Sequence, residues 1–535
     1  MTPLETLERF RPHDGTLAGV LASRAEPDPE RPFLLFGERT LSWGTFADEV
    51  DRIAAVLAGY GIGGGDRVAT FAENRPEIVA LLFAAAKLGA VLVPVNPALG
   101  VDEARYVFEH AGARLVAAGG AAMETARAAA WRLEPAARFV ALEAEDAGDA
   151  PSLGALARGA APLDWNAGRP GDTCVILYTS GTTGFPKGVM HAQSSLVLAG
   201  EGFVERMRLV PEDRLMTVLP LFHINALFYS LMGAVAAGAS LVLEPRFSAS
   251  TFWQRAAATG ATQANIIAAV GAILARRPRA EFVPHAIRKV YGAPVPAEVE
   301  RVFREAFGVP VVLEGYGMTE IPGVCNNPFP GAGRGENRIG SMGKAAVHPD
   351  PAVRFAELRV VDDEGRDVPD GEAGELAVRT PIVMQGYFRD PEASAAAFRD
   401  GWFLTGDLVR RDADGYFWFV ARKKDIIRRR GENVSGAELD RVIGAHPDVA
   451  EAAAIGVASP LGEEDILVAV VVRPGARLAA RDVGAWCAAR LAPHKQPRYV
   501  VFVDALPHTP TLRVAKFRLK QDATLLARAT DLAAP

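Results

Sequence analysis

Hydrophobic and polar positions along the chain follow two alternating periods. The segment "TFADEVDRIAAVLAGYGIGGGDRVATFA" (45–72) spaces apolar residues three and four apart, then has a glycine-rich stop and a short apolar run, and "PEIVALLFAAAKLGAVLVPVNP" (76–97) repeats this order. In each segment, the apolar residues spaced three and four apart predict an amphipathic helix, and the short apolar run after the glycines predicts a buried strand. We therefore predict an α/β fold whose large N-terminal domain contains βα-alternating, mostly parallel sheets covered by helices.

The pattern changes after about residue 350. The segment "AELRVVDDEGRDVPDGEAGELAVRT" (356–380) has short strands separated by D-E-G and D-G turns, which predict a β-rich, mostly antiparallel subdomain. A dense basic run, "ARKKDIIRRRG" (421–431), precedes a second α/β pattern. We place a boundary in this run, with an N-terminal domain over 1–423 and a small α+β C-terminal domain over 424–535.

The most apolar stretch, "LMTVLPLFHINALFYSLMGAVAAGASLVL" (215–243), is interrupted by Pro220, His223 and Asn225. It predicts a strand, a loop and a buried helix, and no membrane span. The N-terminus has acidic residues and no continuous apolar core, so we expect neither a signal peptide nor an anchor. The net charge of -6 excludes the broad basic surface that nucleic-acid binding needs.

Cysteines are few in this chain of 535 residues. The three of them, Cys174, Cys325 and Cys487, are far apart and odd in number. This arrangement argues against a disulfide framework and against a cysteine metal site, and it predicts a reducing, cytoplasmic location.

The strand-like run in "ILYTSGTTGFPKGVMH" (176–191) leads into a loop of glycines, hydroxyls and one lysine. Such loops converge backbone N–H groups on an anion, so we expect a phosphate site. The nucleotide motif G-x-x-x-x-G-K-[ST] needs glycine before the lysine, but here Pro186 precedes Lys187 and Gly188 follows it. The Walker motif is therefore not matched, which argues against a P-loop kinase or GTPase.

Seven stretches in order along nearly the whole chain resemble the adenylate-forming superfamily, and acyl-CoA synthetases in particular. They are "YTSGTTGFPKG" (178–188), "PLFH" (220–223), "GAP" (292–294), "GYGMTE" (315–320), "GYF" (386–388), "GWFLTGD" (401–407) and "RKKDIIRRRGENVSGAELD" (422–440). The resemblance implies that ATP and a carboxylic acid give an acyl-adenylate and pyrophosphate, and that coenzyme A then displaces AMP. It also implies Mg²⁺ as the metal.

The resemblance implies roles for individual residues. The residues expected to hold the β- and γ-phosphates are Thr179, Ser180, Gly181, Thr182, Thr183, Gly184 and Lys187. Those expected around adenine and the α-phosphate are Gly292, Ala293, Gly315, Tyr316, Gly317 and Thr319, with Glu320 as the Mg²⁺ ligand. Asp407, helped by Arg422, is expected to accept both ribose hydroxyls.

A mobile C-terminal lid is also implied by the resemblance. Lys424 matches its hinge, and Gly431, Glu432 and Asn433 match the loop that lines the pantetheine tunnel. The usual C-terminal motif P-x-T-x-x-G-K is here "PHTPTLRVAK", with Arg513 in the place of the catalytic lysine. We favour Arg513 for that role, with Lys516 as the alternative. Arg428, Arg429 and Arg430 either meet the phosphates of coenzyme A or, as we prefer, form a solvated charge run.

The acyl pocket is expected near His223, Asn225, Asn265, Ala269, Met318 and Val324. His223 is expected to position the acid or gate the tunnel, with a buried structural role as the alternative. These mostly uncharged residues favour an apolar acid, although the two asparagines would also suit a polar acyl group. Two other functions stay open from the sequence, namely loading of a separate carrier protein and non-catalytic nucleotide binding. Homo-oligomerisation is left open.

Overall fold

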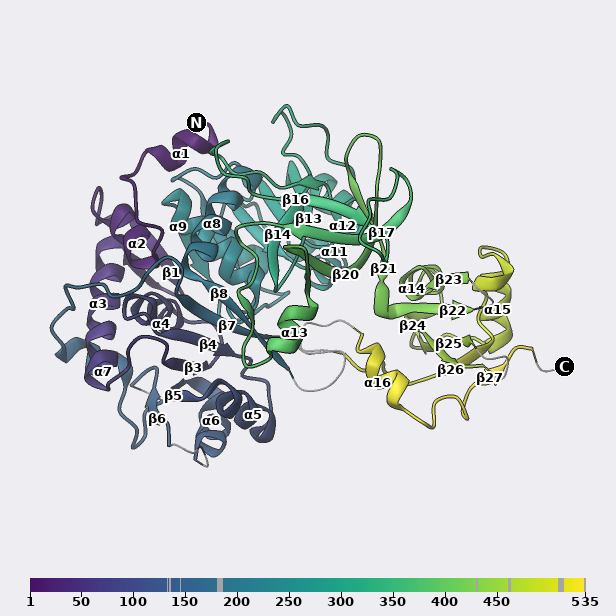
Figure 1. Ribbon diagram of the computed structural model, residues 1–535, viewed down its shortest axis with the longest axis horizontal. Helices are drawn as coiled ribbons and strands as arrows, with labels where there is room; N and C mark the ends of the chain where they lie inside the picture. The colour runs from purple at the N-terminus through teal and green to yellow at the C-terminus, as the bar shows by residue number, and fades with distance from the viewer. Residues whose placement is uncertain are drawn as a thin grey trace. The chain divides into compact units, whose positions relative to one another are not determined.

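The computed structural model describes residues 1–131, 133, 136–144, 146–179, 186–429, 432–459, 463–508 and 514–533. These residues form two compact units (Figure 1). Unit 1 contains the described parts of Met1–Thr179, Pro186–Leu358 and Val378–Phe403, and unit 2 contains those of Arg359–Ala377 and Leu404–Pro535. The predicted boundary near Lys424 stays a prediction.

One sheet of unit 1 has seven strands in the order β18-β8-β7-β4-β3-β5-β6. Its central strands are parallel, and β8 and β18 join antiparallel at one edge. The strands are β3 (Arg67–Phe71), β4 (Val91–Val95), β5 (Ala113–Ala118), β6 (Arg138–Ala141), β7 (Thr173–Thr179), β8 (Lys187–Ala192) and β18 (Gly386–Tyr387).

The second sheet of unit 1 has nine strands in the order β15-β14-β13-β12-β11-β9-β10-β1-β2. Strands β13 to β1 in this order are parallel, and β14, β15 and β2 are antiparallel to their neighbours. The strands are β1 (Pro32–Phe36), β2 (Arg39–Ser42), β9 (Arg214–Thr217), β10 (Ser240–Leu243), β11 (Gln263–Ile266), β12 (Lys289–Gly292), β13 (Val311–Met318), β14 (Ile321–Asn326) and β15 (Lys344–Ala345).

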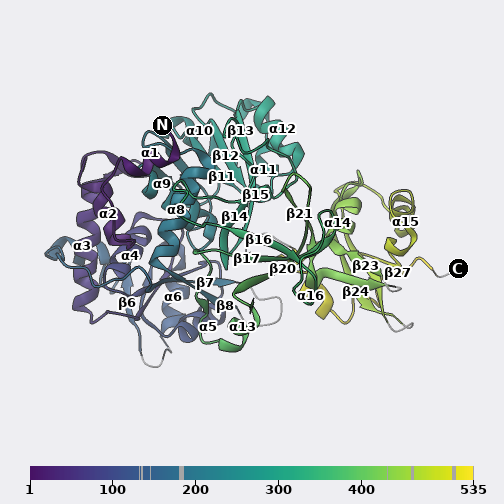
Figure 2. The same cartoon turned by 45° about the horizontal axis from the view of Figure 1, so that its top comes forward.

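Helices cover both sheets, as the alternating pattern predicts. Helix α4 is buried along its whole length and contacts α3, β4 and β7, while α8 packs against α9 and β8 (Figure 2). The helices of this region are α1 (Pro3–Glu8), α2 (Leu17–Ala25), α3 (Trp43–Gly59), α4 (Pro76–Lys87), α5 (Val101–Ala111), α6 (Met123–Ala130), α7 (Leu153–Gly159), α8 (Gln193–Met207), α9 (Met232–Ala237), α10 (Phe252–Thr259), α11 (Ala268–Ala275), α12 (Ala297–Glu305) and α13 (Pro391–Ala396).

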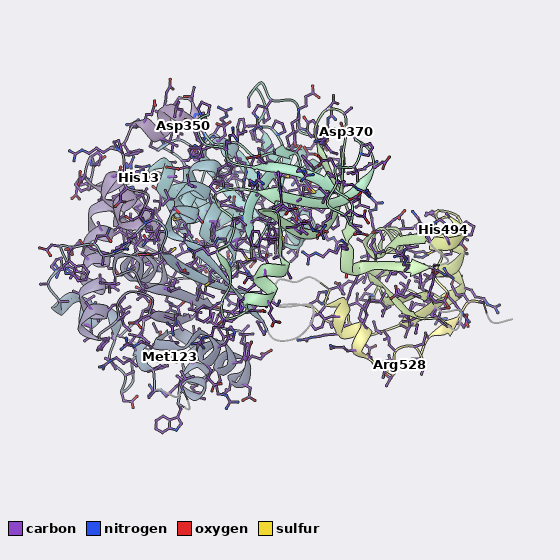
Figure 3. All side chains as sticks on the ribbon, viewed as in Figure 1. His13, Met123, Asp350, Asp370, His494 and Arg528 are labelled. Carbon is purple, nitrogen blue, oxygen red and sulfur yellow. The ribbon has the colours of Figure 1, made fainter. Side chains whose placement is uncertain are left out.

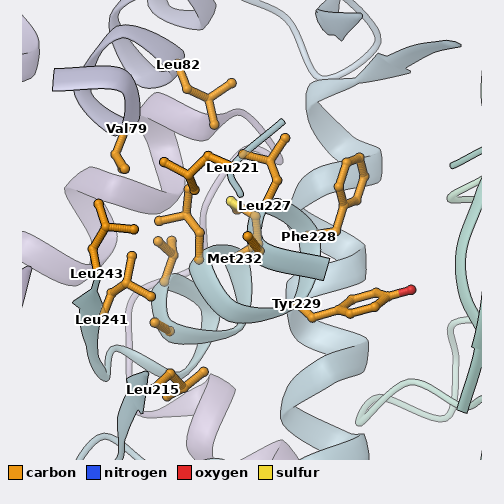
Figure 4. Close-up of a cluster of buried hydrophobic side chains, with 14 of the residues drawn as sticks. Val79, Leu82, Leu215, Leu221, Leu227, Phe228, Tyr229, Met232, Leu241 and Leu243 are labelled. Atoms are coloured by element: carbon orange, nitrogen blue, oxygen red, sulfur yellow. The ribbon is translucent and has the colours of Figure 1, made fainter. Parts of the chain in front are cut away.

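The most apolar stretch of the chain folds as its interruptions predict. Strand β9 is followed by a loop, the buried π-helical segment η2 (Asn225–Leu231), α9 and β10. Leu215, Leu221, Leu227 and Met232 from this stretch pack with neighbouring aliphatic side chains in the core (Figure 4). Within the described part of the chain, no helix is both long enough and apolar enough to span a bilayer.

A buried carboxylate ties distant segments of unit 1 to α8. Glu201 accepts hydrogen bonds from His13 Nε2 at 3.2 Å and from His348 Nε2 at 3.0 Å (His13 is labelled in Figure 3). Burial by itself would raise the pKa of Glu201, but these two hydrogen bonds bring it to about 2. The carboxylate is therefore ionised wherever the protein is folded at ordinary pH.

A separate sheet contains β16, β17, β20 and β19 in that order, with β21 paired to β20. The β19–β20 and β20–β21 pairs are antiparallel, as predicted for this region. The strands are β16 (Glu357–Val361), β17 (Ala373–Arg379), β19 (Phe398–Arg399), β20 (Trp402–Arg411) and β21 (Phe417–Arg422).

The C-terminal part of unit 2 is α+β. It has the hairpin β22 (Ile426–Arg429) and β23 (Glu432–Ser435), and a four-stranded sheet in the order β24-β25-β26-β27. The remaining elements are α14 (Gly436–Gly444), β24 (Val449–Ala458), β25 (Glu464–Val472), α15 (Ala480–Ala488), β26 (Tyr499–Phe502), α16 (Lys516–Gln521) and β27 (Thr530–Asp531). The predicted α/β fold with a small α+β C-terminal part is confirmed.

Candidate active site

The antiparallel β7–β8 hairpin carries the expected phosphate loop. Its strands pair Tyr178 with Gly188 and Thr179 with Lys187, so the loop starts and ends at one point of the sheet. Gly188 has to be glycine, because a Cβ there would lie 2.7 Å from Ile176 Cγ2. The expected loop residues Ser180, Gly181, Thr182, Thr183 and Gly184 lie outside the described residues.

Three functional groups converge beside the base of this hairpin. The Lys187 ammonium lies 3.4 Å from Asp390 Oδ2 and 4.9 Å from the centre of the Tyr387 ring. The Tyr387 hydroxyl donates a 2.8 Å hydrogen bond to Glu320 Oε1. Strand β18 produces this arrangement by pairing Tyr387 with Val189 on β8. The sequence indicated Lys187 and Glu320. Tyr387 lies in the "GYF" motif, but no role was expected for it.

The charges in this group leave Lys187 able to exchange its carboxylate partner for another anion. Lys187 is about one-third exposed, while only 7 % of Glu320 is exposed. Burial, and then the neighbouring Glu320, raises the pKa of Tyr387, so its hydroxyl stays a neutral donor. The backbone N–H of Ala393 and then Lys187 lower the pKa of the exposed Asp390. Lys187 is thus held by an ionised but solvent-exposed partner, which a phosphate group can replace.

Thr319 is fixed through its backbone. His191 Nε2 donates a 2.7 Å hydrogen bond to the Thr319 carbonyl. Burial lowers the pKa of His191 to about 4, so the ring is neutral and its proton sits on Nε2. His191 was not expected from the sequence, where its only signal is its place four residues after Lys187 on the same strand. This histidine positions the segment that precedes Glu320.

Small residues are required where the "GYGMTE" strand meets its neighbours. A Cβ on Gly315 would lie 2.3 Å from the Tyr291 hydroxyl, and one on Gly317 would lie 2.3 Å from the Gly323 nitrogen. Gly292 is similarly restricted by Val295, whose Cγ2 would lie 2.7 Å from the added atom. Tyr316 between the two β13 glycines is half-buried.

The expected acyl-pocket residues occupy two different environments. His223, Met318 and Ala269 are half-buried, and the His223 ring packs at 4.5 Å from that of Phe222. Val324 and Asn265 are fully buried. Asn265 donates to Ser230 and accepts from Gln263, so its amide is engaged inside the fold. Asn225 is also buried, and its Oδ1 has no partner among the described residues.

The expected ribose site is assembled within unit 2. Adjacent strands β20 and β21 place Asp407 opposite Arg422, and Arg422 Nε lies 3.1 Å from Asp407 Oδ1. Asp407 is nearly fully buried, and its backbone N–H donates to Thr405 Oγ1 at 3.1 Å. Arg422 is more than one-third exposed. The pair expected from the sequence is therefore brought together.

Part of the expected lid lies outside what the structure describes. This applies to Gly431, to Arg513 and to the side chains of Lys424, Glu432 and Asn433.

Two basic residues of the C-terminal part have partners inside the fold. Lys516 Nζ lies 2.6 Å from Asp440 Oδ2 and is mostly buried. Arg429 is 7 % exposed, lies 3.3 Å from Asp465 Oδ1 and donates to the His494 carbonyl. The expected solvated run is therefore wrong for Arg429, because alternation along β22 turns its side chain inward while Arg428 stays exposed.

The chain is similar to known AMP-binding enzymes along most of its length. The family model described as AMP-binding enzyme matches residues 21–388, and the model described as AMP-binding enzyme C-terminal domain matches 438–512. The sulfoacetate–CoA ligase of Cupriavidus necator is 35 % identical over 518 residues, covering 95 % of this chain and 98 % of the relative. The indoleacetate–CoA ligase of Aromatoleum aromaticum is 34 % identical over 508 residues, covering 94 % and 96 %.

Solved structures give the same result. ATP-bound MatB from Rhodopseudomonas palustris superposes with a TM-score of 0.84 at 29 % identity, covering 94 % of this chain and 98 % of that one. The anthranilate CoA ligase AuaEII, solved with anthranoyl-AMP, superposes with a TM-score of 0.83 at 26 % identity, covering 97 % and 99 %. Carrier-protein loading and non-catalytic binding are not favoured by these relatives. The chain belongs to the AMP-binding enzyme family and is an adenylate-forming acid–thiol ligase that uses ATP and coenzyme A.

Proposed function

We propose that this protein activates a carboxylic acid as an acyl-adenylate and then transfers the acyl group to coenzyme A. The observation that supports the proposal is the convergence of Lys187, Tyr387 and Glu320 at the base of the β7–β8 hairpin. In the first step a carboxylate oxygen attacks the α-phosphorus and pyrophosphate leaves. In the second step the thiolate attacks the acyl carbonyl carbon and AMP leaves.

The Lys187 ammonium holds the β- and γ-phosphates in this proposal, together with Thr179 and the loop that follows it. The Thr319 hydroxyl binds the α-phosphate, and the neutral His191 keeps this segment in place through the Thr319 carbonyl. Tyr316 stacks on adenine, which passes close to Gly292 and Ala293. Asp407 accepts the ribose hydroxyls, with Arg422 beside it.

Glu320 is the proposed Mg²⁺ ligand, and its surroundings fit this ion. Among the described residues, no group of three or more His, Cys, Asp or Glu side chains is placed to hold a metal. Mg²⁺ commonly uses one or two carboxylates together with substrate phosphates and water, so a single buried carboxylate is sufficient. When bound, the ion neutralises phosphate charge. Tyr387 orients the carboxylate by donating to its Oε1.

Arg513 is the proposed cation for the adenylation step. Lys516, the alternative, is already engaged with Asp440 at 2.6 Å, and separating a mostly buried ion pair is costly. We further propose that Lys424 is the hinge of a mobile lid and that Gly431, Glu432 and Asn433 line the pantetheine tunnel. His223 positions the acid and gates the tunnel.

The acid itself differs among the relatives, whose names specify sulfoacetate, indoleacetate, oxalate and feruloyl-CoA. The test is to mix the protein with ATP, Mg²⁺, coenzyme A and a panel of carboxylic acids. We expect at least one acid to give AMP and a thioester in equal amounts. Formation of ADP with the thioester, or no acid-dependent AMP from any member of a broad panel, would contradict the proposal.

A further inference from the structure

A buried arginine in unit 1 lacks a fixed anionic partner. Arg206 lies in the last turn of α8 and is only 3 % exposed. Its Nη2 donates to the Gly323 carbonyl at 2.6 Å and its Nη1 to the Tyr291 hydroxyl at 3.3 Å, while its Nε has no partner among the described residues. The guanidinium also lies 5.2 Å from the ring centres of Tyr229 and Tyr291.

The groups in contact with the Arg206 guanidinium are a backbone carbonyl and aromatic side chains. Among the described residues, no carboxylate lies within 4.0 Å of the guanidinium. Burial raises the pKa of Tyr229, Tyr291 and Cys325, so none of them supplies a negative charge. Glu314 accepts hydrogen bonds from the backbone N–H groups of Gly340 and Val295, and burial raises its pKa to about 7, which is the opposite of what a cationic partner would do.

Other buried cations have a negative charge in contact or nearby. For Arg24, which is 1 % exposed and donates to Ser23 and the Ala236 carbonyl, it is the neighbouring Glu201, whose charge opposes the lowering of the Arg24 pKa by burial. Lys289 is 4 % exposed and lies 2.6 Å from Asp213, and Arg429 lies 3.3 Å from Asp465. A buried charge is tolerated when a partner of opposite sign offsets the loss of hydration. Aromatic faces and two neutral oxygens offset only part of that loss for Arg206. Among the described residues, the chain therefore supplies no carboxylate in contact with Arg206, and the Nε of this guanidinium stays without a hydrogen-bond partner.

Arg206 lies directly behind the segments expected to line the acyl pocket. A Cβ on Gly323 would lie 2.4 Å from its Nη2, and Gly323 precedes Val324 on β14. A Cβ on Gly317, which precedes Met318 on β13, would lie 2.8 Å from the Tyr229 hydroxyl. Tyr229 follows His223 by six residues, and its ring points away from the aliphatic cluster around Leu227 and Met232 (Figure 4).

On the basis of the proposed acyl-CoA ligase function, we propose that Arg206 binds a second anionic group on the acid, at the end remote from the activated carboxylate. The substrate class is then a small carboxylic acid that carries a further carboxylate or sulfonate. A guanidinium offers several donors to such a group, and the Tyr229 and Tyr291 hydroxyls lie beside it. This inference replaces the apolar acid that the sequence favoured, because an apolar acid would leave the buried cation without a counter-charge.

The test compares acids of equal length that differ in terminal charge. Succinate and 3-sulfopropanoate are compared with butanoate. Succinamate serves as an analogue of succinate whose remote end forms hydrogen bonds but has no charge. The pairs malonate and propanoate, and glutarate and pentanoate, extend the series to other chain lengths. Thioester formation gives kcat/KM for each. For at least one chain length, we expect the anionic acid to exceed its neutral partners by about 100-fold or more, since a site built for a polar group rejects analogues that lack it.

Variants of Arg206 separate recognition from folding. In Arg206→Met we expect kcat/KM for the preferred anionic acid to fall about 100-fold while that for its neutral partner changes less than about threefold. Arg206→Lys keeps the charge and should retain a preference of about tenfold. Turnover of the neutral acid reports that the variant is folded. If Arg206→Met does not fold, the test is decided by the unmodified enzyme, from the ratio of kcat/KM for succinate or its homologues to kcat/KM for their neutral partners.

The outcomes also separate this inference from the proposed function. Two results would overturn the role of Arg206 and leave the ligase function standing. One is an equal kcat/KM for neutral and anionic acids at every chain length. The other is an unchanged ratio of these two kcat/KM values in a folded Arg206→Met. Absence of AMP and thioester with every acid would overturn both.

Discussion

Two charged clusters of unit 1 are built in opposite ways. Around Asp213, which is fully buried, Lys289 and Arg288 each lie 2.6 Å away and Thr262 donates at 2.8 Å, so the fold itself satisfies the charge. The Lys187 ammonium, by contrast, is about one-third exposed, and its ion-pair partner Asp390, at 3.4 Å, is exposed to the same degree. The difference indicates that the first cluster serves stability, whereas the second keeps its cation available for a ligand.

Removing the charge of Asp213 should give the largest effect on stability. Asp213→Asn leaves Lys289 buried without a counter-charge, so we expect a loss of about 3–5 kcal/mol in the free energy of unfolding, measured by urea denaturation. Activity per mole of folded enzyme should be unchanged. Arg288 is about half exposed, so Arg288→Ala should cost only about 1 kcal/mol or less. Equal losses in the two variants would refute the contrast.

Lys187→Met should affect activity strongly and stability little, the opposite of Asp213→Asn. Losing a cation that stabilises phosphate charge should lower kcat about 10²–10³-fold, while the urea midpoint stays close to that of the unmodified protein. The matched control is Arg301→Met, which removes an exposed cation from a surface ion pair on α12 and should leave kcat unchanged. Full activity in Lys187→Met would remove the assignment of this lysine to phosphate binding.

The neutral, buried His191 predicts a smaller, pH-dependent effect. Its folded pKa of about 4 lies below the ordinary histidine value of about 6.5. The unfolded chain therefore binds more protons between these two values, and stability falls as the pH falls through that window. Between pH 7 and pH 5 the unmodified protein should lose about 2 kcal/mol more unfolding free energy than His191→Asn. Parallel pH profiles for the two proteins would show that His191 is already charged or unimportant for stability.

The parts that the sequence predicted are those with local patterns. The helix, stop and strand order at residues 45–72 appears as α3 and β3, and the interrupted apolar stretch forms β9, η2, α9 and β10. Local periodicity and turn residues determine such elements. The pairing of Asp407 with Arg422 also followed from motifs that adjacent strands bring together.

The parts that the sequence did not predict depend on contacts between distant segments. Tyr387 reaches Glu320 across 67 positions, and the Gly323 carbonyl accepts from Arg206 across 117. Arg429 was misread because composition alone does not show which residues of a basic run point inward. The pairing of β18 with β8 determines the contact of Tyr387, and the packing of α8 against β14 determines that of Arg206. The packing of β22 against β25 determines the burial of Arg429.

The central claim, that the acid captures the inner phosphate of ATP, is tested most directly with an acid labelled with ¹⁸O in its carboxylate. The account predicts that one labelled oxygen is transferred to AMP for each thioester formed, because that oxygen joins the α-phosphorus and leaves with AMP. Label in inorganic phosphate or pyrophosphate, or thioester formed with no label in AMP, would contradict the account.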